Sequence, residues 1–142
     1  MPTDDRRLAA DLLRRVDHGR VASSMRALPF LAAARHIVDG RRLLLRMHKG
    51  GGHPTACAGS VVAYGADNLN SAAPADALWS VQLVGLCEPV EPTPDQLHRF
   101  GPAPRRVDGA PYEPVYLRID PAIVTVHLTE GAEDGAERHG RS

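Results

Sequence analysis

The sequence concentrates its reactive side chains in one short segment that also holds three consecutive glycines. Arg46, Met47, His48 and Lys49 lie before these glycines, and His53 follows them. Binding a phosphate requires fixed positive charge or converging N–H donors, and glycines let the backbone approach an anion closely. Two interpretations of this segment stay open: a loop that binds the phosphate of a cofactor or substrate, and a mobile connector.

Two histidines and a cysteine in the same region raise the question of a metal. His48 and His53 are five positions apart, and Cys57 follows four positions later. Zinc sites have other spacings and a fourth ligand is missing, so we predict polar loop histidines and a buried thiol, with no metal. Haem needs only one axial histidine or cysteine and stays an alternative, with His36 and His127 as further candidate ligands.

Other common catalytic motifs are missing from the sequence. It contains no nucleophile elbow, no phosphate-binding loop of the Walker type and no signature of paired carboxylates. An enzyme whose cofactor carries out the redox chemistry does not require such motifs. The sequence is therefore compatible with cofactor-dependent catalysis.

Composition and charge describe an ordinary globular chain. It has 142 residues, of which 43% are hydrophobic and 24% charged, and its formal net charge is zero. A neutral chain has no global basic field, so we expect no nucleic-acid partner. No apolar run reaches about eighteen residues and the N-terminus is acidic, so we expect no membrane segment, no secretory signal and a cytoplasmic protein. We expect a single domain over residues 1–130 and a disordered tail over residues 131–142.

Hydrophobic periodicity and turn residues predict several short strands and few helices. An N-terminal helix begins with Thr3 as its cap and ends near Gly19. A second helix spans residues 94–100, with Thr93 as its cap and Gln96 completing a capping box. The predicted strands comprise residues 20–24, 28–38, 41–47, 60–64, 77–90, 115–119 and 123–128.

The strongest local signal joins the second and third of these strands. Asp39-Gly40 lies between two apolar runs and predicts a type I′ hairpin turn, which needs positive φ at both central residues. Residues 48–54 are predicted to be irregular because of their glycines, and residues 55–59 to form a short helical turn at most. Short strands with hairpin signals favour a mainly β fold, an antiparallel barrel with short helices, over a doubly wound sheet.

Several stretches, taken in order, carry a resemblance to a known family. They are Gly19-Arg20-Val21-Ala22-Ser23, Ile37-Val38-Asp39-Gly40, Leu43-Leu44-Leu45-Arg46-Met47, Val61-Val62-Ala63-Tyr64-Gly65-Ala66-Asp67, Leu78-Trp79-Ser80-Val81-Gln82-Leu83-Val84-Gly85, Tyr116-Leu117-Arg118-Ile119-Asp120-Pro121 and Val124-Thr125. Their order and spacing resemble the pyridoxamine 5'-phosphate oxidase-like family of FMN-binding split β-barrels. The resemblance covers about residues 12–128 and implies an antiparallel split barrel of six or seven strands.

The same resemblance implies a homodimer that holds flavin mononucleotide (FMN) in a cleft between subunits. Haem, the deazaflavin F420 or no cofactor are the alternatives. The residues that correspond to the family's cofactor site are Arg35, His36, Arg46, Met47, His48, Lys49 and His53, with Trp79 near the cleft. Met47 stands where the family often has a hydroxyl residue, and His53 stands near the position of its phosphate-binding lysine.

Three functions stay open on this basis. The first, implied by the resemblance, is a flavin-dependent oxidoreductase that acts on a small molecule. The second is a non-catalytic binder of flavin, haem or a related ligand. The third is a protein whose cleft has been reused for a cofactor-free reaction.

Overall fold

The computed structural model describes residues 2–130, with side chains from residue 5 onward, so the predicted tail at 131–142 lies outside the described residues. The elements, in order, are α1 (Pro2–Leu13), β1 (His18–Met25), β2 (Leu28–Asp39), β3 (Arg42–His48), the 3-10 turn η1 (Gly50–Gly52), α2 (His53–Cys57), β4 (Ser60–Asp67), β5 (Trp79–Pro89), α3 (Pro94–Phe100), β6 (Arg106–Val107), β7 (Ala110–Pro111) and β8 (Pro114–Leu128). In this part of the chain, no helix has the length and apolar character needed to cross a membrane.

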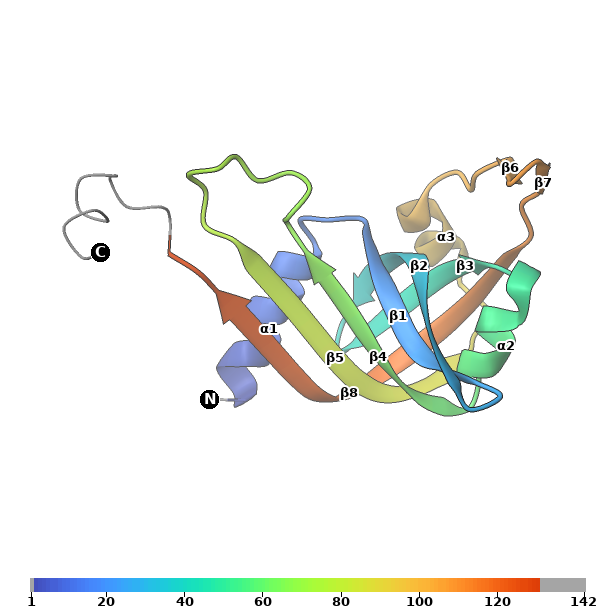
Figure 1. The fold of residues 1–142 in the computed structure, drawn as a ribbon, viewed down its shortest axis with the longest axis horizontal. Coiled ribbons are helices and arrows are strands. Elements are labelled where there is room, and N and C mark those ends of the chain that lie inside the picture. The colour runs from blue at the N-terminus through green and yellow to red at the C-terminus, as the bar shows by residue number, and fades with distance from the viewer. Residues whose placement is uncertain (1, 131–142) are drawn as a thin grey trace.

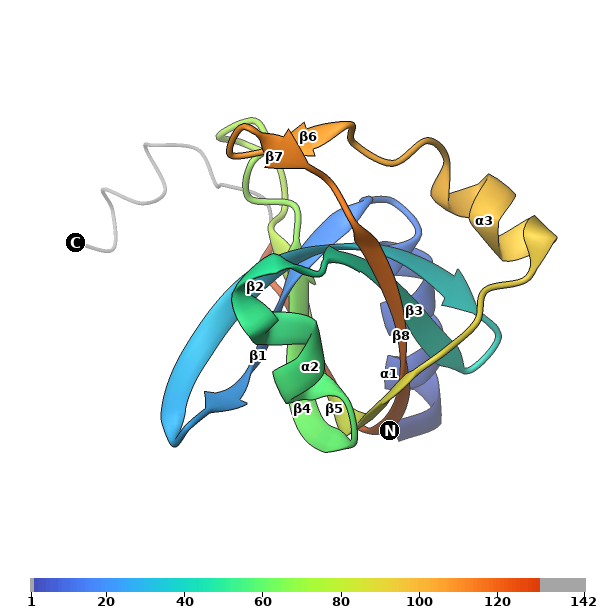
Figure 2. The same cartoon turned by 90° about the vertical axis from the view of Figure 1, so that its right-hand side faces the viewer.

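Six strands close into a barrel in the order β1-β2-β3-β8-β5-β4. All neighbouring strands are antiparallel. Figure 2 shows these strands as a ring, and Figure 1 shows their long, tilted course. The predicted fold class, a mainly β antiparallel split barrel with short helices, is confirmed.

The barrel interior is filled by alternate residues of each strand. Along β5, Trp79, Val81, Leu83, Gly85 and Cys87 are buried, while the residues between them are exposed or half-buried. Leu12 of α1 belongs to the same core cluster, so the helix extends the core beyond the strands. The period of two gives each strand one core face and one outer face.

The turn between β2 and β3 lies one residue later than predicted. Asp39 pairs with Arg42, so Gly40 and Arg41 are the two turn residues. Of these two, only Gly40 has a positive φ, of 62°. Positive φ at the first central position alone is the pattern of a type II′ turn, which replaces the predicted type I′ turn.

β8 is a single strand of 15 residues where two strands were predicted. The expected break at Pro121 is a bulge instead: Gly85 pairs with Pro121 and Val84 with Ile123, which leaves Ala122 without a partner. A bulge tolerates proline because the ladder there does not need its missing N–H. The strand therefore continues through the bulge without ending (Figure 1).

α1 begins and ends earlier than predicted. It begins at Pro2, so Thr3 lies inside the helix and does not cap it, and it ends at Leu13 and not near Gly19. The N–H of Arg15 then bonds to the carbonyl oxygen of Leu12, three residues back, at 3.0 Å. Such a bond tightens the last turn and satisfies a carbonyl group that the helix leaves free.

α3 has the predicted bounds and the predicted capping box. The Gln96 N–H donates to Thr93 Oγ1 at 3.1 Å, and the Thr93 N–H donates to Gln96 Oε1 at 2.9 Å. The proline-rich segment after α3 was predicted to be a loop. It contains the small β6–β7 hairpin, whose strands of two residues each are too short to give a periodic pattern.

Replacing Gly85 with alanine should destabilise the fold strongly. An added Cβ would overlap with the carbonyl oxygen of Asp120 on β8, which is backbone and cannot move aside like a flexible side chain. Overpacking of this kind costs about 1–3 kcal/mol, measured as a loss in the free energy of unfolding in urea. Gly65→Ala is the matched control, because its Cβ would lie 3.8 Å from the nearest backbone atom, the Val81 carbonyl oxygen. Equal losses in the two variants would contradict the close contact at the bulge.

Candidate functional site

A pocket of about 540 Å³ lies where the open end of the β2–β3 hairpin meets η1, α2 and the β6–β7 hairpin. Figure 1 shows α2 and the β6–β7 hairpin at the same end of the barrel. The lining residues are Ala32, Ala33, Met47, His48, Gly50, Gly51, His53, Val107, Asp108 and Ala110. The pocket therefore brings together Met47, His48 and His53 of the predicted site with one carboxylate, Asp108, and otherwise small or apolar residues.

Glycines form one wall of this pocket in a conformation that other residues rarely adopt. Gly51 and Gly52 have φ angles of 83° and 76°, in the region that favours glycine. The segment predicted to be irregular is a 3-10 turn, and α2 follows it directly from His53. Helical structure was predicted to begin at residue 55, but it begins earlier. The two glycines with positive φ turn the chain before His53, so α2 can begin there.

The hydrogen bond that His48 accepts fixes its neutral tautomer. Its Nδ1 accepts from the backbone N–H of Glu113 at 3.1 Å. In the neutral ring the proton is therefore on Nε2, which is left as the donor. The ring also packs against Tyr112, with 5.2 Å between the ring centroids. His48 is thus held in place as a hydrogen-bond donor at the pocket.

His53 and Lys49 lie on either side of the glycines. The His53 ring stacks on Phe30, with centroids 4.5 Å apart and planes inclined by 17°. Lys49 is exposed, and its N–H donates to the carbonyl oxygen of Glu113 at 2.9 Å. Lys49 is outside the set of lining residues but lies between two of them, His48 and Gly50. A permanent cation and two imidazoles thus accompany the glycine wall.

Arg20 is a further candidate that the sequence analysis missed. In the β1–β2 register it is directly opposite Ala33, which lines the pocket. Directly opposite residues in an antiparallel pair have Cβ atoms about 4.5–5.5 Å apart and share one face. Arg20 is exposed on that face. Only the strand register brings this arginine beside the pocket, and no local motif marks it.

Arg46 and Arg35 lie elsewhere, beneath α3. Arg46 is 5% exposed and donates to the carbonyl oxygen of Gly101 at 2.8 Å. Arg35 is its cross-strand partner and donates to the carbonyl oxygen of Arg99 at 3.1 Å. Both guanidinium groups lie over the Phe100 ring, 5.4 and 5.9 Å from its centroid. Neither arginine lines the pocket; the pair attaches the end of α3 to the barrel.

His36 is buried in a fully hydrogen-bonded environment, away from the pocket. Its Nε2 lies 2.8 Å from the carbonyl oxygen of Leu13, and its Nδ1 lies 2.5 Å from the Tyr64 hydroxyl. Of the two neutral tautomers, the one with the proton on Nε2 satisfies both contacts, as donor to Leu13 and acceptor from Tyr64. Burial lowers the pKa of His36, which favours this neutral form. The histidine therefore links the end of α1 to the barrel.

Trp79 and the two cysteines belong to the core and do not line the pocket. Trp79 is 7% exposed, and its backbone N–H donates to Asn68 Oδ1 at 2.9 Å. Cys57 and Cys87 are buried free thiols, and burial raises their pKa to about 11 and about 12. Such thiols stay protonated at neutral pH and are poor metal ligands. Within the described part of the chain, no three His, Cys, Asp or Glu side chains are grouped to hold a metal.

Comparisons of the sequence with known proteins find one family and one clear relative. A family model described as pyridoxamine 5'-phosphate oxidase matches residues 5–128. The uncharacterized protein Rv0080 of Mycobacterium tuberculosis is 39% identical over 102 residues, which are 68% of this chain and 64% of that protein. The chain thus spans less than two thirds of the length of this relative.

Several solved structures share the fold at low sequence identity. The FAD binding protein from Mycobacterium smegmatis has a TM-score of 0.67 at 21% identity and covers 87% of this chain and 96% of its own. A putative pyridoxamine 5'-phosphate oxidase from Corynebacterium glutamicum has a TM-score of 0.65 at 20% identity, with 91% and 92% covered. The FAD and heme binding protein from Mycobacterium smegmatis has a TM-score of 0.64 at 18% identity, with 96% and 77% covered. At such identities the likeness shows a common fold.

His36 should make the stability of the protein sensitive to acid. Its pKa is lowered in the folded protein from an ordinary value of 6.5, so below that pH the unfolded chain binds the proton more readily. The stabilising contribution of the neutral ring is complete above about pH 6.5 and is lost as the pH falls toward the folded pKa. We expect the free energy of unfolding in urea to be lower at about pH 5.5 than at about pH 7.5.

The variant His36→Gln tests the origin of this effect. It cannot titrate, so its loss of stability between the two pH values should be smaller than that of the wild type. His98→Gln, which changes an exposed histidine of α3, should behave like the wild type. If all three proteins lose the same stability, other groups cause the acid sensitivity.

Proposed function

Because this chain belongs to the pyridoxamine 5'-phosphate oxidase family, we propose that it binds a flavin, with FMN as the expected form, in the pocket at η1 and α2. One observation carries the proposal: two imidazoles, a glycine wall and the neighbouring Lys49 meet at a pocket whose other walls are largely apolar. The fold shared with FAD-binding proteins of Mycobacterium smegmatis supports it. We propose further that the protein is an oxidoreductase acting on a small molecule.

The polar part of the pocket has the chemistry that a phosphate needs. His48 and His53 supply ring donors, and Lys49 supplies permanent charge. Hydrogen bonds to charged groups contribute about 1.5–3 kcal/mol each. Gly50 and Gly51 present backbone without side chains, which lets an anion approach closely. These donors fit the phosphate group of a flavin nucleotide.

The apolar part of the pocket suits a ring system. Ala32 and Ala33 are small, and Met47 and Val107 add further apolar surface. A volume of about 540 Å³ lies within the usual range of small-molecule sites, about 300–1,000 Å³. A bound flavin supplies the electron-transfer or hydride-transfer chemistry. The protein's own residues hold the phosphate, orient the ring and keep water from the covered face.

Four residues implied by the family resemblance have no part in this proposal. Arg35 and Arg46 donate to the carbonyl groups at the end of α3, His36 is saturated by Leu13 and Tyr64, and Trp79 is in the core. Redirecting any of them to a ligand would break buried hydrogen bonds or core packing. Lys49 and Arg20 are therefore the cations that we assign to the phosphate.

The colour of the purified protein tests the cofactor class directly. A yellow protein that releases flavin on denaturation supports the proposal. A red protein with a Soret band would favour haem, and the distinct absorption of F420 would favour a deazaflavin. A colourless protein that binds no added flavin would favour a cofactor-free role for the cleft.

We propose that a second copy of the chain covers the outer face of the barrel beside this pocket, giving a homodimer. Successive cross-strand partners form an apolar row across five strands: Leu31, Ala22, Ala63, Val84 and Ile123. Leu31 and Ile123 are 64% and 59% exposed, and the neighbouring cross-strand pair Val61 and Leu86 is 64% and 42% exposed. A contiguous apolar sheet surface of this kind is typical of a protein interface.

Removing the charge beside the glycine wall should weaken flavin binding. Lys49→Ala and His53→Ala are each expected to raise the dissociation constant of FMN by about tenfold, because each removes a group that the proposal assigns to the phosphate. The measurement is quenching of flavin fluorescence when apo protein is titrated with FMN. His98→Ala is the control, because His98 is an exposed histidine on α3. If FMN binding to the wild-type protein does not saturate below about millimolar FMN, the proposal is wrong.

Amine acylation gives an independent readout of the same site. Lys49 is the sole lysine of the sequence, so a lysine-selective reagent modifies this side chain and the α-amino group. Bound FMN should slow acylation at Lys49, seen in the mass of its peptide, and leave the α-amino group unchanged. Acylation of Lys49 at the same rate with and without FMN would place the phosphate elsewhere.

A charge in the apolar row should dissociate the proposed homodimer. Light scattering should give about twice 15.3 kDa for the wild type and about 15.3 kDa for Ile123→Asp, because burying an unpaired carboxylate is costly. Leu97→Asp is the control, because Leu97 is 42% exposed on α3, outside the row. A wild type that remains monomeric at micromolar concentration would contradict the homodimer.

A further inference from the structure

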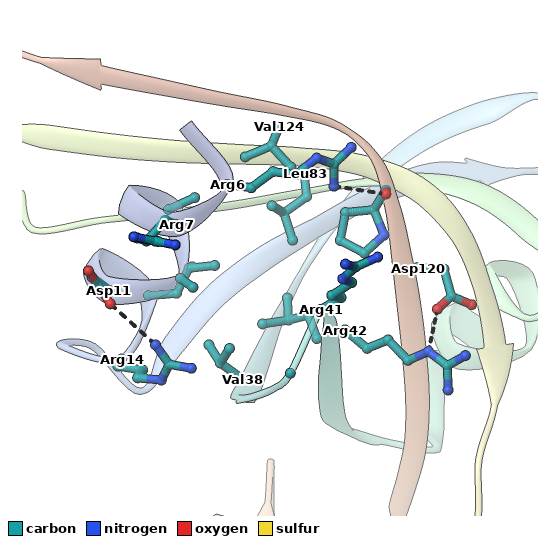
Figure 3. A pocket seen from close by; sticks show the side chains of 16 residues that line it. Arg6, Arg7, Asp11, Arg14, Val38, Arg41, Arg42, Leu83, Asp120 and Val124 are labelled. Atoms are coloured by element: carbon teal, nitrogen blue, oxygen red, sulfur yellow. Dashed lines mark hydrogen bonds and ion pairs between the residues drawn. The ribbon is translucent and has the colours of Figure 1, made fainter. Parts of the chain in front are cut away.

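A second cavity lies between α1, the turn of the β2–β3 hairpin and the bulge of β8 (Figure 3). Its volume is about 880 Å³. Val38 and Leu43, close to the hairpin turn, line this cavity, whereas Ala33 and Met47, at the open end of the same hairpin, line the η1–α2 pocket. The two cavities are therefore separate, and the proposed flavin site does not use this one.

The lining of the second cavity is strongly basic. Its charged residues in the described chain are Arg6, Arg7, Arg14, Arg41 and Arg42 against Asp11 and Asp120, which is five positive charges minus two, or a net +3. The whole sequence has a formal net charge of zero, so this is a local concentration of positive charge. A concave surface of one sign raises the local concentration of oppositely charged ligands.

Protein groups already engage three of the five arginines and both aspartates. Arg14 pairs with Asp11 at 3.3 Å, and Arg42 pairs with Asp120 at 2.7 Å. Arg6 donates to two backbone carbonyl oxygens of the β8 bulge, at 3.2 and 2.9 Å. These contacts fix the walls of the cavity and neutralise its acidic groups.

Arg7 and Arg41 are the arginines left for a ligand. Among the side chains described, no hydrogen bond or ion pair reaches either guanidinium group, and Figure 3 shows them on different elements, with Arg7 against α1 and Arg41 toward the bulge of β8. A guanidinium group is always charged and matches the geometry of phosphate or carboxylate oxygens. Each of the two residues can therefore pair with an anionic group at the rim of the cavity.

The rest of the cavity is apolar. Leu13, Val38, Leu43 and Leu83 are buried core residues that also line it, and Val124 is half-buried beside them. The four core side chains are already shielded from water, so the apolar surface that a ligand could cover belongs to the half-buried Pro121 and Val124. An apolar group would cover this surface at a gain of about 25 cal/mol per Å². The cavity thus combines a cationic rim with an apolar floor.

We propose that this cavity binds an organic anion that carries an apolar body. The phosphate or carboxylate group pairs with Arg7 or Arg41, and the apolar body covers Pro121 and Val124. Three probes separate these contributions: octyl phosphate, octanoate and inorganic phosphate. Calorimetric titration should show one site for octyl phosphate or octanoate, bound at least about tenfold more tightly than inorganic phosphate. The tighter of the two alkyl probes identifies the anionic group.

Paired variants test the assignment. Arg7→Gln combined with Arg41→Gln should weaken the better alkyl probe by about tenfold or more. Arg15→Gln combined with Arg105→Gln removes the same charge from exposed positions outside the cavity and should change the affinity by less than about twofold. Circular dichroism should show both double variants folded, because none of these four side chains has a partner in the described structure.

Several results would overturn the proposal. The first is that neither alkyl probe binds the wild type saturably. The second is that the variant carrying Arg7→Gln and Arg41→Gln keeps its affinity for the probe. The third is that both double variants lose the same affinity. Displacement of bound FMN by the probe would place it in the η1–α2 pocket and also refute the proposal. Because the titration is run with and without FMN, its outcome is separate from that of the flavin proposal.

Discussion

At Gly85 the backbone of β8 approaches β5 so closely that no side chain fits between them, and this contact lets one strand close the barrel. β8 pairs with β3 over residues 114–119 and with β5 over residues 117–128, so residues 117–119 are hydrogen-bonded to both strands. The first residue of β8, Pro114, is opposite His48, so the same strand carries the β6–β7 hairpin to the pocket. Closure of the barrel and assembly of the candidate site therefore depend on one strand.

The bulge also determines where α1 lies. The carbonyl groups of Pro121 and Ala122 accept from Arg6 near the start of the helix, and the carbonyl of Leu13 accepts from His36 at its end. Two long-range contacts of this kind hold a helix whose own sequence gives it only a narrow apolar stripe. The arginine-rich cavity is the space that remains between the helix held in this way and the hairpin turn.

Signals from residues close in sequence predicted much of the fold. The candidate site was harder to predict because it depends on strand register, which pairs residues distant in sequence. The capping box of Thr93 and the hairpin signal at Gly40 involve residues close in sequence, so the sequence alone located both. The bulge at Pro121 depends on the partner strand, and its proline was therefore taken as a break between two strands. The position of Arg20 beside Ala33 likewise depends on pairing that no local pattern encodes.

The family resemblance pointed to the loop that borders the η1–α2 pocket, and also to two arginines that lie outside that pocket. Arg35 and Arg46 are close in sequence to the pocket, yet they are cross-strand partners on the face beneath α3. Residue type did not separate them from ligand-binding cations, because the difference lies in the acceptors around each guanidinium group. Arg46 is enclosed by backbone carbonyls that a ligand would have to displace, whereas Arg7 and Arg41 face a cavity.

The β2–β3 hairpin therefore has three parts with different roles. Its middle, at Arg35 and Arg46, is held to the end of α3 by hydrogen bonds and serves as scaffold. Its open end, at Ala33 and Met47, and its turn each border a cavity in which polar groups are left for a ligand. Because the rigid middle separates the two ends, a substitution at either cavity can alter binding there without disturbing the pairing that closes the barrel.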